Sequence, residues 1–541
     1  MKKLIILFLF AAAYHSLIFS QNFEIIWQQC YGGSQEELVY DAAVINDKLY
    51  IVGATKSQDG DVSFNHGTAD AWLIVADTVG NIIWEKTYGG SNGDWFAKIL
   101  PTDNNTIYLL GSTASSDGDI SYDPYPGSRD IWVVKIDILG NILWEKVIGG
   151  GMIDNVESGA LASDGGVVVF GWTGSQDGEV TVNYGMYDMW LVKLNSDGDI
   201  EWDKSFGTDD FDYGTAIIST SDGGFLIGGV STIGNGGNLT CIPFNLNAEA
   251  IIIKLDSIGN IEWQNCYGGS GHDGVNALLE VYDGYIISAY GSSADGDLSG
   301  SGWHGNSDIW IIKIDYWGNI IWQKCYGGSR YESALNIFST TDNHLVIIGA
   351  TESKDGDITN NHSISEYSND IWVLKINNVG DIITQKCFGG IGNDFIMSGA
   401  LQKSDNNYVI AAYTNYGPSF DVGCTPYGGN GDIDYWVFEI MLDDTTNVIE
   451  PVAGERGLWV YPNPAKEYIQ FEVRSWKFEV MEFRLFDVFG RQVAEKQITS
   501  EQTILDVTLL PDGIYFYRIY PVPSGEESNE VTYSGKIVIL K

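Results

Sequence analysis

Short runs of alternating apolar and polar residues recur along most of the chain, and they are arranged in a repeating unit. In the first complete unit the runs cover residues 38–45, 49–55, 71–76 and 82–87. Such alternation is typical of β-strands that bury one face. A hairpin signal, Gly80-Asn81, separates the last two runs. It recurs as Gly140-Asn141, Asp197-Gly198, Gly259-Asn260, Gly318-Asn319 and Gly380-Asp381. The pattern predicts four antiparallel strands per unit.

An Asp-x-Trp signature marks the third run of the units. It begins at Asp70, Asp130, Asp188, Asp308, Asp370 and Asp434, and the fourth copy has drifted to Glu249-Ala250-Ile251. A second signature, aromatic-Gly-Gly-Ser, begins at Tyr31, Tyr88, Tyr267 and Tyr326, with looser versions at Ile148, Phe206 and Phe388. Seven units without helical periodicity predict a β-propeller, and a linear β-solenoid is the alternative.

The two ends of the repeated region predict a closed ring. Residues 24–30 have the pattern of a fourth strand with no strands before it, and the seventh unit ends after its third strand at Leu442-Asp443. The N-terminal strand is therefore expected to complete the last blade, which removes an exposed sheet edge. We predict an all-β chain with a seven-bladed β-propeller over residues 23–443.

Composition and the N-terminus limit the classes of binding partner and indicate export. The net charge is -43, from 72 acidic and 29 basic residues, which disfavours binding to nucleic acid or anionic lipid. A plain solvated acidic surface explains the same charge. Residues 1–20 have the charged start, apolar run and cleavage point of a signal peptide. No later run is apolar for about 18 residues, so no transmembrane span is expected in the mature chain.

The C-terminal region differs from the repeats. Residues 444–457 have the composition of a linker, and residues 458–541 have short alternating runs that predict a small immunoglobulin-like β-sandwich. Four motifs stand in order in this segment: residues 458–465, 486–491, 510–515 and 535–541. Together they resemble the type A C-terminal sorting domain of the type IX secretion system. An ordinary immunoglobulin-like accessory domain is the alternative.

The resemblance carries specific expectations. It implies recognition by the type IX secretion machinery and delivery, through the periplasm, to the outer cell surface or the medium. The residues that match the motifs are Tyr461, Pro462, Asn463, Pro464, Asp487, Gly490, Arg491, Gly513, Tyr515, Lys536 and Lys541. The repeat unit itself resembles the propeller repeats of about 60 residues in secreted proteins of Bacteroidetes-type bacteria, which implies a fold rather than an activity.

A carboxylate follows each aromatic-Gly-Gly signature by six residues. These carboxylates are Glu37, Asp94, Asp154, Asp212, Asp273, Glu332 and Asp394. They fall near the start of the innermost strands, where an acidic ring around the channel mouth is one interpretation. The other is that each accepts backbone N–H bonds from its own loop.

The long loops repeat an Asp-Gly-acid element that suggests calcium. The candidate ligands are Asp59, Asp61, Asp117, Asp119, Asp295, Asp297, Asp355 and Asp357. Carboxylates at i and i+2 supply the oxygen ligands that Ca²⁺ prefers, but Asp-Gly is also an ordinary turn. No other cofactor is indicated.

The cysteines are expected to be free thiols. Cys30, Cys266, Cys325 and Cys387 share one repeat position at the ends of fourth strands, and Cys241 and Cys424 lie in loops of blades four and seven, which are also expected to be distant. Equivalent positions in different blades are too far apart for a disulfide.

The regular placement of the acidic groups favours a binding protein over an enzyme. We expect a secreted or cell-surface protein whose propeller binds a glycan or a protein. The alternative is an extracellular polysaccharide hydrolase or lyase, which needs non-repeating polar residues in one pocket, such as His272, Asp209, Arg330 and Tyr331. A purely structural envelope component is a third possibility.

Overall fold

The computed structural model describes residues 22–443 apart from 103, 233, 235 and 242–246. In the C-terminal region it describes residues 458–461, 468–473, 481–487, 491–498, 502–511, 513–521 and 533–539. The predicted signal peptide and linker lie outside these residues. The chain divides into two compact units, residues 22–442 and the described residues from Asp443 onwards. Strands dominate both units. No helix among the described residues is long and apolar enough to cross a membrane.

The first unit consists of four-stranded antiparallel sheets that follow the predicted repeat, and we number them in chain order. Sheet 1 comprises β2 (Glu37–Ile45), β3 (Lys48–Thr55), β4 (Asp70–Ala76) and β5 (Ile82–Tyr88). Sheet 2 comprises β6 (Asp94–Pro101), β7 (Thr106–Thr113), β8 (Asp130–Asp137) and β9 (Ile142–Ile148). Sheet 3 comprises β10 (Asp154–Leu161), β11 (Val167–Thr173), β12 (Asp188–Leu194) and β13 (Ile200–Phe206).

The next three sheets have the same order of strands. Sheet 4 comprises β14 (Asp212–Ser219), β15 (Phe225–Thr232), β16 (Ala248–Leu255) and β17 (Ile261–Tyr267). Sheet 5 comprises β18 (Gly274–Val281), β19 (Gly284–Gly291), β20 (Asp308–Ile314) and β21 (Ile320–Tyr326), with a 3₁₀ turn, η1 (Gly296–Leu298), in its long loop. Sheet 6 comprises β22 (Glu332–Ser339), β23 (Leu345–Thr351), β24 (Asp370–Ile376) and β25 (Ile382–Phe388).

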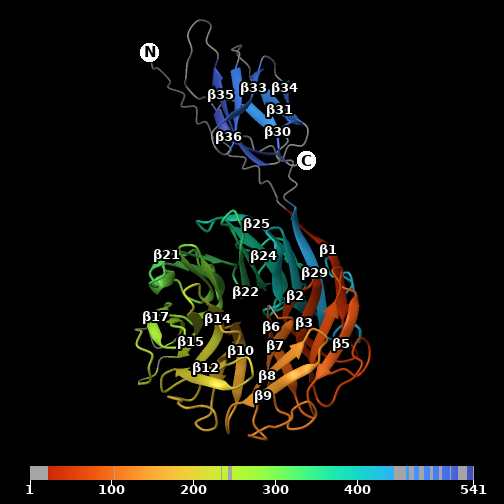
Figure 1. Cartoon of the computed structure of the whole chain (residues 1–541), viewed down its shortest axis with the longest axis vertical. Helices are drawn as coiled ribbons and strands as arrows, with labels where there is room; N and C mark the ends of the chain where they lie inside the picture. Colours follow the sequence, from red (N-terminus) through yellow and green to blue (C-terminus); the bar gives the residue numbers. More distant parts are fainter. Residues whose placement is uncertain are drawn as a thin grey trace, which may run out of the picture. The chain divides into compact units, whose positions relative to one another are not determined.

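Sheet 7 combines the beginning and the end of the unit. Its innermost strand is interrupted, so that β26 (Asp394–Phe395) and β27 (Ala400–Ser404) both pair with β28 (Asn407–Thr414). The next strand is β29 (Asp434–Asp443), and β1 (Asn22–Tyr31) pairs with it as the outermost strand. Figure 1 shows β1 beside β29.

Successive sheets contact each other through their innermost strands. β2 contacts β6, β6 contacts β10, and the series continues to β22, while β2 also contacts β27 and β28 of sheet 7. Large side chains fill the spaces between sheets: Trp72 of sheet 1 and Tyr435 of sheet 7 are fully buried, with ring centroids 5.0 Å apart. Burying each such side chain contributes about 2–3 kcal/mol.

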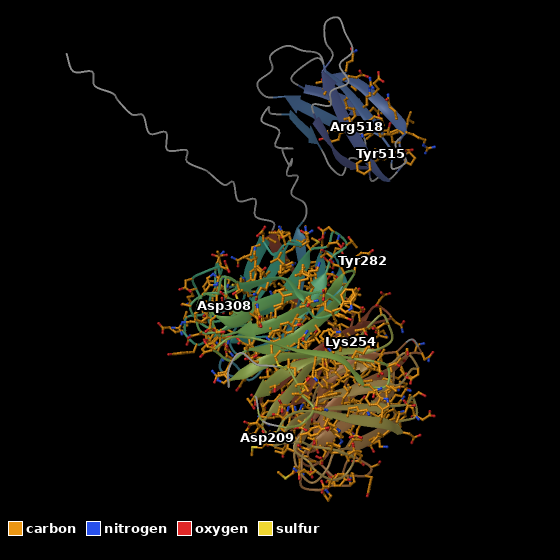
Figure 2. The ribbon with its side chains drawn as sticks, turned by 90° about the vertical axis from the view of Figure 1, so that its left-hand side faces the viewer. Asp209, Lys254, Tyr282, Asp308, Tyr515 and Arg518 are labelled. Atoms are coloured by element: carbon orange, nitrogen blue, oxygen red, sulfur yellow. A yellow bond between two sulfur atoms is a disulfide. The ribbon has the colours of Figure 1, made fainter. Side chains whose placement is uncertain are left out.

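The first unit has two unlike faces. The short turns within each sheet, such as the one that holds Tyr282, lie on one side, and the long loops and the connections between sheets lie on the other. In Figure 2, Tyr282 and Lys254 lie along one side of the unit, and Asp209 and Asp308 lie along the opposite side.

Four of the six cysteines form disulfides, so the prediction of free thiols is wrong for them. Cys30 pairs with Cys424, with Cα atoms 5.9 Å apart, and Cys241 pairs with Cys266, with Cα atoms 5.5 Å apart. In both cases the long loop of a sheet lies beside the fourth strand of the same sheet. The prediction compared only equivalent positions in different blades and overlooked this contact. Cys325 and Cys387 are free and buried, as predicted.

The C-terminal unit consists of two antiparallel sheets. One contains β30 (Leu458–Tyr461), β31 (Tyr468–Val473) and β34 (Gln502–Asp506). The other contains β33 (Gln492–Ile498), β32 (Met481–Phe486), β35 (Gly513–Pro521) and β36 (Tyr533–Ile539). Ile469 from one sheet and Phe483 from the other are fully buried in one shared apolar core.

Candidate functional site

The seven predicted acidic-ring residues lie at the starts of the innermost strands, but they are buried, with exposures of 0 to 2%. Each accepts an N–H bond from its own loop. In sheet 3, the N–H of Gly150 donates to Asp154 Oδ2 (2.8 Å), and the Ser175 hydroxyl donates to the same oxygen (2.8 Å). The Thr173 hydroxyl donates to the other oxygen of Asp154. The carboxylate therefore fastens the loop before its own strand.

A second buried carboxylate stands beside each of these residues, and it belongs to the preceding sheet. Asp130 of β8 lies against Asp154 of β10, for example, and a Cβ added to Gly149 would be 2.3 Å from Asp130 Oδ1 and 2.6 Å from Asp154 Oδ2. The first glycine of the repeated signature leaves room for this contact. We call each such couple a seam pair. The others are Asp70/Asp94, Asp188/Asp212, Glu249/Asp273, Asp308/Glu332, Asp370/Asp394 and Asp434/Glu37.

The seam pairs are short of hydrogen-bond donors. Buried oxygens without a partner occur on Asp70, Asp130, Asp188, Asp308, Asp370, Asp394 and Asp434. Burial, followed by the neighbouring carboxylate of Asp154, raises the pKa of Asp130 to about 8. The pKa of Asp434 beside Glu37 is raised to about 8 for the same reasons. Two adjacent buried carboxylates do not readily ionise together, so the Asp130/Asp154 and Asp434/Glu37 pairs each share a proton at neutral pH.

The candidate calcium ligands also bind the glycine-containing connections. Asp59 Oδ1 accepts the N–H of Ser34 (2.8 Å), and Asp61 Oδ2 accepts the N–H of Gly32 (3.2 Å). The same two bonds recur at Asp117 and Asp119, Asp295 and Asp297, and Asp355 and Asp357. Within the described parts of the chain, no three His, Cys, Asp or Glu side chains lie together as a metal-binding group. Calcium at these residues stays a prediction.

The innermost strands surround a cavity of about 650 Å³. In the first six sheets each innermost strand has a register shift, and the extra residue lines the cavity. Such bulges re-aim a side chain. In sheet 7 the interruption between β26 and β27 places Met397 in the cavity wall. The cavity-lining residues at these positions are Tyr40, Ala97, Glu157, Thr215, Asn276, Leu335 and Met397. They are seven different residue types.

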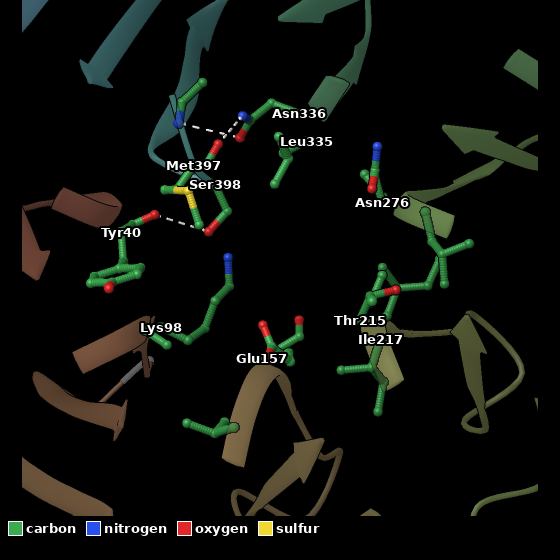
Figure 3. Close-up of a pocket in the computed structure, with 18 of the residues that line it drawn as sticks. Tyr40, Lys98, Glu157, Thr215, Ile217, Asn276, Leu335, Asn336, Met397 and Ser398 are labelled. Atoms are coloured by element: carbon green, nitrogen blue, oxygen red, sulfur yellow. Dashed lines mark hydrogen bonds between the residues drawn. The ribbon is translucent and has the colours of Figure 1, made fainter. Parts of the chain in front are cut away.

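One part of the cavity wall carries charged groups. Lys98 Nζ and Glu157 point towards the middle of the cavity in Figure 3. Lys98 is paired with Asp41 at 3.0 Å. Glu157 Oε1 accepts bonds from Asn155 Nδ2 (2.7 Å) and Trp172 Nε1 (3.2 Å). Desolvation by the surrounding walls raises the pKa of Glu157.

Arg129 enters the cavity wall from the long loop of sheet 2. Its carbonyl accepts the N–H of Asp154 (2.8 Å), and the equivalent carbonyl makes this bond at every sheet junction. The side chain at this position differs from sheet to sheet, so the fold does not require arginine here. The Arg129 guanidinium lies over the Trp95 ring, 5.3 Å from its centroid, and its buried Nε has no partner.

The opposite part of the wall carries amides and apolar groups. Asn276 Nδ2 is buried without a partner. Asn336 donates to the Met397 carbonyl (3.0 Å) and accepts the N–H of Ala400 (3.2 Å), which holds the interrupted strand in place. The Ser398 hydroxyl donates to the Tyr40 carbonyl (3.0 Å) and joins sheet 7 to sheet 1 (Figure 3).

The residues proposed for an enzymatic pocket are not among those that line this cavity: His272, Asp209, Arg330 and Tyr331. Arg330 pairs with Glu366 at 2.8 Å and lies over the Tyr367 ring. Sequence reasoning missed the bulge residues. They stand three positions after each ring carboxylate, and the signal was the variation at this position among otherwise similar repeats.

Among the sorting-motif residues, Tyr461 ends β30, Gly513 begins β35, and Lys536 lies in β36. Asp487 and Arg491 close a turn, in which Asp487 Oδ1 accepts the Arg491 N–H (2.9 Å) and Oδ2 accepts Arg491 Nε (2.7 Å). The Tyr515 hydroxyl donates to the carbonyl of residue 511 (2.8 Å). The remaining predicted motif residues lie outside the described residues: Pro462, Asn463, Pro464, Gly490 and Lys541.

Residues 459–539 match the family described as the secretion system C-terminal sorting domain. The sorting-domain prediction is therefore confirmed. A domain of this family directs export through the type IX secretion system, and the protein is delivered to the cell surface or the extracellular space.

Other similarities are remote. The chain is 24% identical over 229 residues to the regulatory protein FlaEY of Caulobacter vibrioides, which covers 37% of this chain and 23% of that protein. PorZ of Porphyromonas gingivalis, a surface component of the type IX secretion system, has a TM-score of 0.26 at 11% identity over 95% of this chain and 70% of its own. A polysaccharide lyase that degrades ulvan has a TM-score of 0.45 at 10% identity over 75% of this chain and 95% of its own. At these scores the names say nothing about the ligand of this chain.

Proposed function

We propose that this exported protein is a surface or secreted binding protein, and that its first unit is a closed seven-bladed propeller of the kind found in secreted Bacteroidetes proteins. Its ligand, a glycan or a protein segment, enters the central cavity. The type IX secretion machinery acts on the C-terminal unit, and the first unit binds the ligand after export.

Contacts between sheet 7 and sheet 1 support the closed ring. β1 completes sheet 7 by pairing with β29. The N–H of Glu37 donates to the carbonyl of Ile433 (2.8 Å), which is the bond found at every other junction between sheets. The Trp72 and Tyr435 rings meet across the same junction. Pairing with β1 covers the edge of β29 that would otherwise be open.

The observation that carries the binding proposal is the set of seven different side chains at one repeat-equivalent position in the cavity. The fold repeats the seam carboxylates in all seven sheets, because every junction has the same structural need. It imposes no residue type at the bulges. Concave sites with a few convergent polar groups are the usual places for ligands.

Two features favour binding over hydrolysis. Glycoside hydrolysis needs two carboxyl groups across the scissile bond, and Glu157 is the carboxylate that lines this cavity. Its neighbour Asp41 is held by Lys98 and by the N–H of Ile99. Burial raises the pKa of Tyr40, which opposes a role for its phenolate as a base in elimination at neutral pH.

The proposal is tested by screening the full chain on a glycan and peptide array, beside a double variant, Glu157→Ala/Asn276→Ala, in which cavity polar groups are lost. We expect the native chain to retain a ligand that the double variant loses. Asp197→Ala is the matched control, because Asp197 lies in an exposed turn between β12 and β13 and does not line the cavity. This variant should bind like the native chain. Equal binding by the native chain and the cavity variant would overturn the proposal. Release of shortened or unsaturated sugars would instead establish the enzyme.

A further inference from the structure

We propose that the ligand of the cavity is a glycan that carries carboxylate groups, and that Arg129 is the residue that binds a carboxylate of that glycan. This inference rests on the proposed binding function and names the class of ligand.

Arg129 has the features of an anion receptor. Its Nε is buried and has no hydrogen-bond partner, and among the described residues its guanidinium forms no ion pair. Arg330 is an instructive contrast, because it also lies over an aromatic ring but pairs with Glu366 at 2.8 Å. The guanidinium lies over the Trp95 ring, 5.3 Å from its centroid, and the planar N–H groups of a guanidinium suit the two oxygens of a carboxylate.

The other charges of the cavity are already engaged. The Lys98 ammonium is paired with Asp41, and Glu157 accepts bonds from Asn155 and Trp172. Desolvation raises the pKa of Glu157, and the nearby charge of Arg129 opposes that shift. Arg129 is thus the cation of the cavity wall whose buried Nε has no hydrogen-bond partner among the described residues, and its charge also acts on Glu157. In a chain of net charge -43, such a local cation decides whether an anionic ligand is held.

The remaining groups fit a sugar. Tyr40 supplies an aromatic side chain to the cavity wall, and Asn276 supplies a buried amide. Aromatic faces bind the apolar faces of sugar rings, and amides such as that of Asn276 bind hydroxyl groups. A cavity of about 650 Å³ has room for a short oligosaccharide.

The position of the cavity favours a glycan over a protein as the source of the carboxylate. The innermost strands of all seven sheets line the cavity, so a ligand that contacts both Glu157 and Asn276 has to extend into it. A single extended sugar chain fits this requirement better than a flat protein surface does. An acidic peptide segment is the competing source, and the experiment includes it.

The test is isothermal titration of the full chain with oligogalacturonate of defined length and with its methyl ester, and with an acidic peptide and a sulfated oligosaccharide as competing anionic ligands. The ester removes only the charge. We expect the uronate to bind about 10- to 100-fold more tightly than the ester, because a charge-assisted hydrogen bond is lost. Arg129→Gln should weaken uronate binding to the level of the ester, and Arg129→Lys should restore part of the difference. Arg330→Gln is the matched control and should bind like the native chain. Circular dichroism and thermal unfolding show that each variant is folded.

Several outcomes separate the inference from the proposed function. If uronate and ester bind equally, or if Arg129→Gln retains the preference for uronate, the inference is wrong, while binding in the cavity still stands. A sulfated oligosaccharide or an acidic peptide that binds more tightly than the uronate would also overturn it. If neither probe binds, the carboxylate-bearing glycan is excluded at this site, and the array comparison with Glu157→Ala/Asn276→Ala decides the proposed function by itself.

Discussion

The seams between sheets and the wall of the central cavity use positions only three residues apart on the same innermost strands. At the seam every sheet has a buried carboxylate, as at Asp154. At the bulge three residues later every sheet has a different side chain, as at Glu157. The seam residue meets its own loop and the neighbouring sheet, whereas the bulge residue meets the cavity.

This difference shows that the fold requires a carboxylate at each seam but accepts different residue types at the bulges. Each junction between sheets has the same free N–H groups to satisfy, so each has the same acceptor. A bulge points its side chain into open space, where packing does not select a residue type. We therefore expect changes at seams to alter stability and changes in the cavity to alter binding.

The largest expected loss of stability comes from the disulfide that fastens the first strand of the ring. Cys30 and Cys424 are separated by 394 residues, and Cys241 and Cys266 by 25. In the chain-entropy model these loops correspond to about 6 and about 3.5 kcal/mol. Cys30→Ser/Cys424→Ser should therefore lower the free energy of unfolding in urea more than Cys241→Ser/Cys266→Ser does.

The second pair of substitutions is the matched control, because it removes the same kind of bond from the same place in another sheet. Equal losses from the two double variants would show that the bond in sheet 7 does nothing more than its counterpart in sheet 4. Ligand binding in the cavity should be unchanged in both.

The next largest effect is expected from a single seam carboxylate. Asp154→Ala leaves the N–H of Gly150 and the hydroxyls of Thr173 and Ser175 without their acceptor in a buried place. Such losses cost about 3–5 kcal/mol in total. Urea unfolding of the full chain followed by tryptophan fluorescence measures this change.

Glu157→Ala is the control for that variant and the sharpest test of the comparison. It removes a carboxylate three residues away that lines the cavity, so the free energy of unfolding should fall by about 1 kcal/mol or less. Ligand binding should change instead. A loss of stability like that of Asp154→Ala would mean that the two positions do not have separate roles.

Much of the architecture was visible in the sequence because it repeats. Alternation located the strands, and the unpaired fourth-strand pattern of residues 24–30 pointed to the strand that joins β29. The ring carboxylates were also found, and backbone N–H bonds from their own loops were one of the two interpretations, but their burial and their carboxylate partners were not predicted. The partner of Asp154 is Asp130, which belongs to a different repeat, and one-dimensional periodicity does not reveal which residues of adjacent repeats touch.

The parts that sequence reasoning missed are those that depend on local geometry. A β-bulge leaves no composition signal, so Tyr40 and Asn276 were not recognised as cavity residues. The disulfides were missed because the loop that contains Cys424 returns beside its own sheet. The length of a loop does not give its path. The isolated guanidinium of Arg129 likewise became visible only with the packing around it.

A smaller effect is expected when pH is changed. The folded-state pKa of Asp130 is about 8, above the value near 4 of an unfolded chain. The stability that this raised pKa contributes is fully present below about pH 4 and is lost as pH rises through about 8. The melting temperature should therefore fall between about pH 6 and pH 9, as measured by calorimetry.

Asp130→Asn tests the origin of that slope. The amide resembles the protonated acid and can donate to Asp154, so this variant should be more stable than the native chain by about 1–2 kcal/mol at pH 9 and should depend less on pH. An unchanged slope would show that the Asp130/Asp154 pair does not share a proton.

The smallest expected effect concerns calcium. The experiment distinguishes two roles for the acidic loops: accepting backbone N–H bonds, as the seam carboxylates do, or binding a metal ion. Asp59 and Asp61 already accept the N–H groups of Ser34 and Gly32, so an ion would have to compete with bonds that hold the connection between sheets. We expect excess EDTA to change the melting temperature by less than about 1 °C, since removing an unbound metal removes nothing. A fall of about 5 °C that added Ca²⁺ reverses would instead assign these carboxylates to calcium. The loops would then be metal sites rather than a second set of backbone acceptors beside the seams.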